Sequence, residues 1–105
     1  MHFTNIQDLI SKNKVMIFSK TYCPFCSKAK DLLKAKNASF CALEMDKESA
    51  EVSQAASSQL LQLTQQKTVP NIFINAKHIG GCSDLERLDA SGELDKLLST
   101  AALAG

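Results

Sequence analysis

The chain has 105 residues, enough for a single hydrophobic core, and we expect residues 1–105 to form one domain. Its composition, 45% apolar and 22% charged, is ordinary for a globular protein, and a formal net charge of +1 without a Lys/Arg cluster gives no electrostatic reason to expect nucleic acid as a partner. No apolar run is long enough to cross a bilayer, so we expect no membrane partner.

The first predicted elements are a short helix and a buried strand. Thr4–Gln7 has the form of a capping box, in which the threonine would cap the helix start. Asn13 and Lys14 should end this helix, and the apolar run Val15–Phe18 that follows predicts a short strand. The inner face of the helix is predicted to carry Ile6, Leu9 and Ile10.

The next stretch, Lys20-Thr21-Tyr22-Cys23-Pro24-Phe25-Cys26, leads into a helix expected to run to about Lys36. With Cys23 as the N-cap, Pro24 takes the first helical position, which favours proline because the N–H it lacks would be unpaired there. A sulfur at this cap faces free backbone N–H groups and the positive end of the helix dipole, and Lys20 adds a cation nearby. That environment favours thiolate over thiol. Cys26 follows one turn later, within plausible disulfide reach, so the pair is predicted to be a redox dithiol.

Two other interpretations of the cysteine pair are weaker. A structural zinc site usually needs four ligands, but the other cysteines and histidines are scattered singly, so no metal is expected. An inert structural disulfide would close too small a loop to constrain the unfolded chain much. The first residues also lack the pattern of a signal peptide, and we therefore expect a reducing, cytoplasmic location, where Cys-x-x-Cys is more often catalytic.

The middle of the chain predicts a second strand and a third helix. Phe40–Glu44 should pair in parallel with the first strand, completing a strand–helix–strand unit after a stop at Asn37. Asp46 is predicted to cap the third helix. The helix that begins after Cys23 has an outer face that is interpreted as solvated, with Lys28, Lys30, Asp31 and Lys34. The inner face of the third helix is predicted to carry Val52, Ala55, Ala56, Leu60 and Leu63.

The last third predicts a hairpin and two helices. Asn71–Ile74 and Lys77–Ile79 should pair around a turn at Asn75-Ala76. Ser83 is predicted to cap the next helix, Ser91-Gly92 to break it, and a final helix to bury Leu94, Leu97, Leu98, Ala101 and Ala102. Joining the halves gives an α/β fold: a mixed four-stranded sheet, half parallel and half antiparallel hairpin, flanked by helices. Cys-x-x-Cys after its first strand is typical of a thioredoxin-like redox fold.

Two further motifs lie in the second half. Thr68-Val69-Pro70 directly precedes the hairpin, and the residues alone leave open whether the Val69–Pro70 bond is trans or cis. Gly80-Gly81-Cys82-Ser83-Asp84 ends the hairpin and begins a helix, whose N-terminal N–H groups suit an anion, although a plain turn with a capped helix explains it equally well. With Lys20-x-x-Cys23-Pro24-Phe25-Cys26, in this order and spacing, the chain resembles a dithiol glutaredoxin from about Val15 to Leu98.

The resemblance implies a thioredoxin fold, a cis proline at Pro70 and glutathione as the reducing co-substrate. It also implies a glutathione site, whose chemistry the residues present would suit. Lys20 and Lys67 would meet the glycine carboxylate, and the Val69 main chain, between Thr68 and Pro70, would pair with the cysteinyl residue. The N–H groups of Cys82 and Ser83, beside Gly81, would hold the γ-glutamyl carboxylate, Asp84 the ammonium, and Phe25 an apolar wall.

Some positions depart from the family pattern. Ser57 stands where many members have a glutamine that contacts the glycine carboxylate, Thr64-Gln65 replaces Thr-Gly, and Phe25 replaces a commoner tyrosine. Gln54 and Gln66 are candidate substitutes for that glutamine. Cys41 is expected to be a buried small hydrophobe, and Cys82 a partly exposed and passive residue.

The implied function is an enzyme, a monomeric glutathione-dependent thiol–disulfide oxidoreductase. Cys23 would attack, Cys26 would resolve, and the partners would be glutathione and glutathionylated or disulfide-containing proteins. A thioredoxin proper would be expected to show Trp-Cys-Gly-Pro-Cys, and this chain has no tryptophan. The alternative from another class is a carrier of a glutathione-ligated [2Fe–2S] cluster. Pro24, which stiffens the loop, and Cys26, which competes for Cys23, argue against it.

Overall fold

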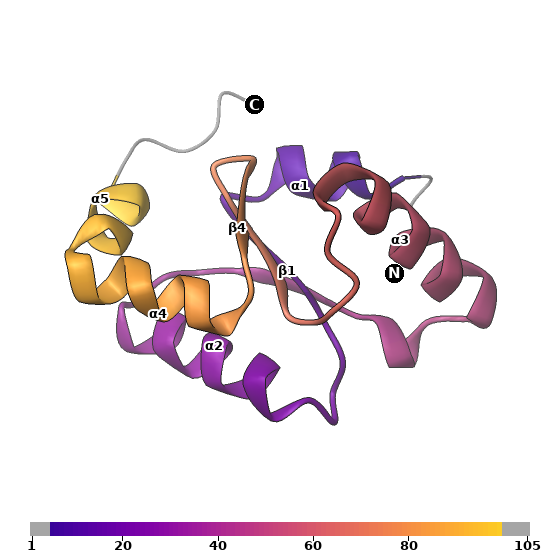
Figure 1. Ribbon diagram of the computed structural model, residues 1–105, viewed down its shortest axis with the longest axis horizontal. Coiled ribbons are helices and arrows are strands. Elements are labelled where there is room, and N and C mark those ends of the chain that lie inside the picture. The colour runs from indigo at the N-terminus through magenta and orange to yellow at the C-terminus, as the bar shows by residue number, and fades with distance from the viewer. Residues whose placement is uncertain (1–4, 100–105) are drawn as a thin grey trace.

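Four strands form one mixed sheet in the order β2-β1-β3-β4 in the computed structural model, which describes residues 5–99 (Figure 1). β1 pairs in parallel with β2 and antiparallel with β3, and β3 and β4 form an antiparallel hairpin. The predicted fold class is therefore confirmed. The strands are β1 (Val15–Ser19), β2 (Cys41–Glu44), β3 (Asn71–Ile74) and β4 (Lys77–Gly80).

Helices cover both faces of this sheet (Figure 1). They are α1 (Ile6–Lys12), α2 (Pro24–Ala35), the short 3-10 helix η1 (Met45–Lys47), α3 (Ala50–Thr64), α4 (Cys82–Ser91) and α5 (Glu93–Ser99). α1 and α3 pack on one face, and α2, α4 and α5 pack on the other. No helix within residues 5–99 is both long and apolar enough to span a membrane.

The central strand β1 is buried on both sides because successive side chains point to opposite faces. Met16 and Phe18 join the core under α1 and α3, whereas Val15 and Ile17 join the core under α2, α4 and α5. Complete burial of such side chains contributes about 1.5–3 kcal/mol each. This double-sided packing fixes β1 firmly, and its C-terminal end is the point from which the cysteine loop leaves.

The helix starts differ from the predicted ones. In α1 the cap is Asn5, whose Oδ1 accepts the Gln7 N–H at 2.7 Å; the predicted cap, Thr4, lies outside the described residues. In α3 the cap is Ser49, because the chain first forms η1, and Asp46 instead binds the backbone N–H (2.9 Å) and hydroxyl of Thr21.

The prediction for α4 was also wrong at its first residue. The helix begins at Cys82, earlier than expected, so the N-cap is Gly81 and Ser83 lies exposed in the first turn. The Asp84 carboxylate accepts the Gly81 N–H at 2.9 Å and thus performs the capping. The helix ends at Gly92, with φ of 85°, as predicted.

The predictions for the buried face of α3, the hairpin turn and the buried face of α5 are confirmed in part. In α3, Ala56 and Leu60 are buried as predicted, but Ala55 and Leu63 are exposed, so the buried stripe is narrower than the apolar pattern suggested. The hairpin turn falls at Asn75-Ala76, where both residues have positive φ (53° and 65°), as a type I′ two-residue hairpin turn requires. Leu94 in α5 is buried, whereas Ala101 and Ala102 lie outside the described residues.

Candidate active site

Cys23 caps α2 with its sulfur. Its Sγ accepts the backbone N–H of Cys26 at 3.2 Å, and Pro24 occupies the first helical position, as predicted. The turn is closed by a hydrogen bond from the Cys23 N–H to the Lys20 carbonyl at 3.1 Å. The sulfur therefore lies where N–H dipoles and the helix N-terminus favour a negative charge, and the residue is only half-buried, so a reagent can reach it.

Cys26 lies directly behind Cys23 and has the opposite character. It is fully buried, and this burial is the main cause that raises its pKa from 9.0 to about 11. The hydrogen bond and the charge of Cys23 raise the pKa further, while the neighbouring Lys20 backbone and Ser19 side chain lower it. The outer cysteine is thus suited to attack from solvent, and the inner one stays protonated until a base removes its proton.

The loop before β3 lies against the outer sulfur. The Val69–Pro70 bond is cis, as the resemblance implied, and the Val69 carbonyl oxygen lies 3.7 Å from Cys23 Sγ. Gln66 fastens this loop, because its Nε2 donates to the carbonyls of Thr68 at 2.9 Å and Pro70 at 3.0 Å. The side-chain amide of Gln66 is therefore already engaged, which argues against it as the substitute for the family's glutamine.

The start of α4 borders the same loop. A Cβ built on Gly81 would lie 3.7 Å from the Pro70 carbonyl oxygen, so the two backbones run close together. Asp84 is partly exposed beside them, bound to the Gly81 N–H and 3.4 Å from Arg87. Cys82 is buried, contrary to the expected partial exposure, and burial raises the pKa of its thiol.

Exposed aromatic and basic side chains occur close to Cys23 in the chain and in the loop before Val69. Tyr22 and Phe25 are 70% and 62% exposed, and both flank Cys23 in the chain. The Lys20 ammonium lies 5.9 Å from the centroid of the Tyr22 ring. Lys67 is exposed and pairs with no acidic side chain within residues 5–99, which leaves its charge for a ligand. Gln54 is exposed on α3, and no contact assigns it to this site.

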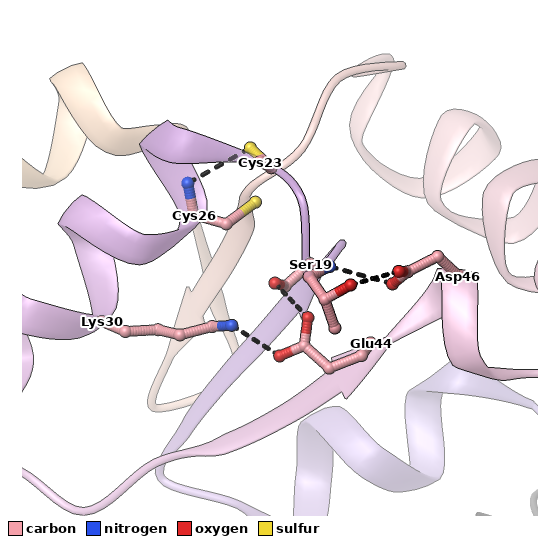
Figure 2. A network of polar contacts seen from close by, with 7 residues as sticks. Ser19, Cys23, Cys26, Lys30, Glu44 and Asp46 are labelled. Carbon is pink, nitrogen blue, oxygen red and sulfur yellow. Dashed lines mark hydrogen bonds and ion pairs between the residues drawn. The ribbon is translucent and has the colours of Figure 1, made fainter.

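A polar network beneath the cysteines was missed from the sequence (Figure 2). Ser19, fully buried, donates to Glu44 Oε1 at 2.6 Å, and Lys30 lies 2.5 Å from Glu44 Oε2. The prediction that Lys30 is only solvated is therefore wrong. The signal was available: a parallel strand–helix–strand unit brings the ends of its strands together, and Ser19 is the register partner of Glu44.

The structure thus brings together three of the predicted groups: Cys23 with Cys26, Val69 with Pro70, and Gly81 with Asp84. Lys20 borders them through the turn at Cys23, whereas Lys67 and Thr68 are exposed in the loop just before Val69. No group of three or more His, Cys, Asp or Glu side chains suited to a metal ion occurs within the described part of the chain. The arrangement can support thiol–disulfide exchange.

Comparisons with known proteins agree with this chemistry. The family model described as Glutaredoxin matches residues 15–79. A tomato (Solanum lycopersicum) glutaredoxin is 47% identical over 103 residues, covering 96% of this chain and 92% of that protein. The crystal structure of a buckwheat glutaredoxin–glutathione complex is similar with a TM-score of 0.85 and 42% identity, covering 89% of this chain and 83% of that one. The solution structure of the dithiolic glutaredoxin 2-C-Grx1 from Trypanosoma brucei brucei has a TM-score of 0.84 and 40% identity, covering 94% of this chain and all of that one.

Proposed function

The chain belongs to the glutaredoxin family, and from this we propose that it is a dithiol, glutathione-dependent thiol–disulfide oxidoreductase. The observation that supports the proposal most directly is the asymmetry of the cysteine pair. Cys23 is accessible and its sulfur accepts an N–H at a helix start, while Cys26 is buried behind it with its pKa raised to about 11. One sulfur is suited to attack and the other to act only afterwards.

In the proposed reaction with a glutathione mixed disulfide, the Cys23 thiolate attacks the glutathione sulfur. A bond forms between Cys23 and glutathione, the substrate thiolate leaves, and it takes a proton from solvent. A second glutathione, as its thiolate, then attacks the glutathione sulfur bound to Cys23. Glutathione disulfide and the Cys23 thiolate are the products, so the substrate thiol is freed while one incoming glutathione is oxidised together with the glutathione that was already in the mixed disulfide.

With a protein disulfide, Cys23 attacks one substrate sulfur and the other leaves as a thiolate. Cys26, after losing its proton, attacks the Cys23 sulfur and releases the second substrate thiolate. The product is a Cys23–Cys26 disulfide, which two glutathiones reduce in turn. The partners that we propose are therefore glutathione and proteins that are glutathionylated or carry disulfides, and the compartment is the reducing cytoplasm.

We place the glutathione along the loop and the start of α4. The main chain of Val69 lies beside the attacking sulfur, where it would pair with the cysteinyl residue of an extended ligand. The first-turn N–H groups of α4, at Cys82 and Ser83, would bind the γ-glutamyl carboxylate, and Asp84 the neighbouring ammonium. At the other end, the unpaired charge of Lys67 and that of Lys20 suit the glycine carboxylate. Phe25 supplies the apolar wall.

The proposal is tested by turnover of a small glutathione mixed disulfide. Cys23→Ser should abolish turnover, because a hydroxyl cannot replace the thiolate, whereas Cys26→Ser should retain it and lose most reduction of protein disulfides. Cys41→Ser is the matched control, since Cys41 lies half-buried in β2 and should leave both activities intact. Equal losses of turnover in the Cys23 and Cys26 variants would overturn the division of roles. A molecular mass of 11.4 kDa by light scattering would support the expected monomer.

A further inference from the structure

The buried cysteine poses a problem that the proposed reaction leaves open. Cys26 must lose its proton before it can attack the Cys23 sulfur, but it is fully buried. In the reduced protein its pKa of about 11 leaves only roughly one molecule in ten thousand with the thiolate at pH 7. During this step Cys23 is part of a disulfide, so its sulfur is unable to take up the proton. Because the Cys26 sulfur is shielded from water, a neighbouring protein group would have to take the proton.

A hydrogen-bonded pair of polar side chains lies next to this sulfur. The Ser19 side chain is close enough to Cys26 to lower the pKa of its thiol, and the Ser19 hydroxyl donates to Glu44 Oε1 at 2.6 Å. Figure 2 shows the Cys26 sulfur, the Ser19 oxygen and the Glu44 carboxylate one after another beneath the cysteine loop. Each of the three residues comes from a different element, α2, β1 and β2, and the parallel pairing of the two strands places Ser19 beside Glu44.

We propose that Ser19 and Glu44 form a proton relay that deprotonates Cys26 for the resolving step. The Ser19 proton passes to Glu44 Oε1 while the Cys26 S–H proton passes to Ser19 Oγ. The result is a Cys26 thiolate, an intact serine and a protonated Glu44, with no net gain or loss of protons. The thiolate then attacks the Cys23 sulfur and expels the thiolate bound to it. The inference rests on the proposed function and assigns a positioning residue, Ser19, and a base, Glu44, to one of its steps.

The surroundings of Glu44 suit a group that exchanges protons with solvent. Its side chain is 23% exposed, unlike Ser19 and Cys26, so the proton can leave to water from the carboxylate. Lys30, itself 18% exposed, lies 2.5 Å from Oε2 and holds the carboxylate in a fixed orientation. Another acid drawn in Figure 2, Asp46, is bound to Thr21 and not to Ser19 or Glu44. The charged group in contact with Glu44 is therefore Lys30.

The test follows the resolving step alone. The reduced protein is mixed with glutathione disulfide to form the mixed disulfide at Cys23, and the first-order release of glutathione by Cys26 is recorded from pH 6 to 10. We expect Glu44→Gln and Ser19→Ala each to slow this release about 100-fold at pH 7, the lower end of the range for loss of a general base. Glu44→Gln keeps the shape and the acceptor for Ser19, and it is the less disruptive change.

The pH profile separates a relay from a structural effect. Without the relay, the rate constant of glutathione release should rise about tenfold per pH unit up to the pKa of Cys26, because hydroxide then removes the proton. The variants and the unchanged protein should converge above pH 9. The double variant should be no slower than the slower single variant, since both changes interrupt one path. A uniform slowing at every pH, or additive losses, would overturn the proposal.

The matched control is Glu86→Gln. Glu86 also pairs with a lysine of α2, Lys28 at 3.0 Å, but both side chains are well exposed and lie away from the relay. It should release glutathione at the unchanged rate. Turnover of a small glutathione mixed disulfide in a Cys26→Ser background tests the proposed function without the relay. Failure of that turnover overturns the function, whereas normal turnover with normal release in Glu44→Gln and Ser19→Ala overturns only the relay.

Discussion

Asp84 has two roles in the structure, and substitutions can separate them. Its carboxylate accepts the Gly81 N–H at 2.9 Å and so caps α4, and in the proposed function it binds the glutathione ammonium. Loss of such a cap lowers the free energy of unfolding by about 1 kcal/mol, and loss of the ion pair with Arg87, whose side chain is well exposed, lowers it by only about 0.3 kcal/mol more. Asp84→Ala should therefore lower the free energy of unfolding by about 1 kcal/mol and the melting temperature by about 4 °C for a domain of this size.

Asp84→Asn isolates the second role. Its amide oxygen can still accept the Gly81 N–H, so the melting temperature should stay within about 1 °C of the unchanged protein. The charge is lost, however, and a hydrogen bond to a charged group is worth about 1.5–3 kcal/mol. We therefore expect kcat/KM for glutathione mixed disulfides to fall about 10- to 100-fold in both variants.

The assays are thermal unfolding followed by circular dichroism and steady-state turnover of a small glutathione mixed disulfide. Alkylation of Cys23 by a small neutral reagent serves as the control, because it needs only the start of α2. An unchanged melting temperature in Asp84→Ala would refute the capping argument. Unchanged kcat/KM in Asp84→Asn would refute the placement of the ammonium.

Three further predictions concern stability. Gly80→Ala should lower the free energy of unfolding in urea by at least 2 kcal/mol, because a Cβ there would lie 2.3 Å from the Asp84 carboxylate and φ is +119°. Gly92→Ala should lower it by only about 1 kcal/mol, because φ is +85° but the space around the residue is open. Equal losses in the two variants would contradict the clash with Asp84. Burial raises the pKa of Cys26 from 9.0 to about 11, so the folded state holds this proton more tightly than the unfolded chain. The stability that results is present below pH 9 and should decline as the pH rises from 9 to 11. Unfolding curves of Cys26→Ser should show a smaller decline, because burial also raises the pKa values of Cys41 and Cys82, which remain. Ser49→Ala should destabilise by about 1 kcal/mol through loss of the α3 cap, and a denaturant midpoint that does not move would show that the cap is not at Ser49.

The sequence predicts the fold well because its elements depend on local patterns. The apolar run at Val15–Phe18, the proline after Cys23 and the two-residue turn at Asn75-Ala76 each have a short-range cause, and the structure contains all three. Helix starts were harder, because several polar residues compete for each cap. Asp46 was predicted as a cap, but it is bound instead to Thr21, which is 25 residues away in the chain.

The candidate site shows the same difference between features with a short-range cause and features that depend on distant residues. The cysteine pair and the cis proline loop are contiguous motifs, and their positions relative to one another follow from the order of the strands. Ser19, Lys30 and Glu44 carry no motif, because their meeting depends on the register between two strands and on one face of α2. Each looks like an ordinary polar residue until the sheet is assembled.

The fastening of the loop by Gln66 has a consequence for affinity. Its amide binds carbonyls on both sides of Val69, while its own N–H donates to Thr64 Oγ1 at 3.0 Å and that oxygen also accepts from Asn71 at 3.2 Å. Both ends of the segment from Gln65 to Pro70 are thus immobilised before any ligand arrives. Ordering a backbone residue costs about 1–2 kcal/mol of conformational entropy. Because this segment is ordered when the protein folds, ligand binding does not have to order it. A side chain that touches no ligand in this arrangement can therefore set how tightly a peptide-like ligand is held beside Cys23.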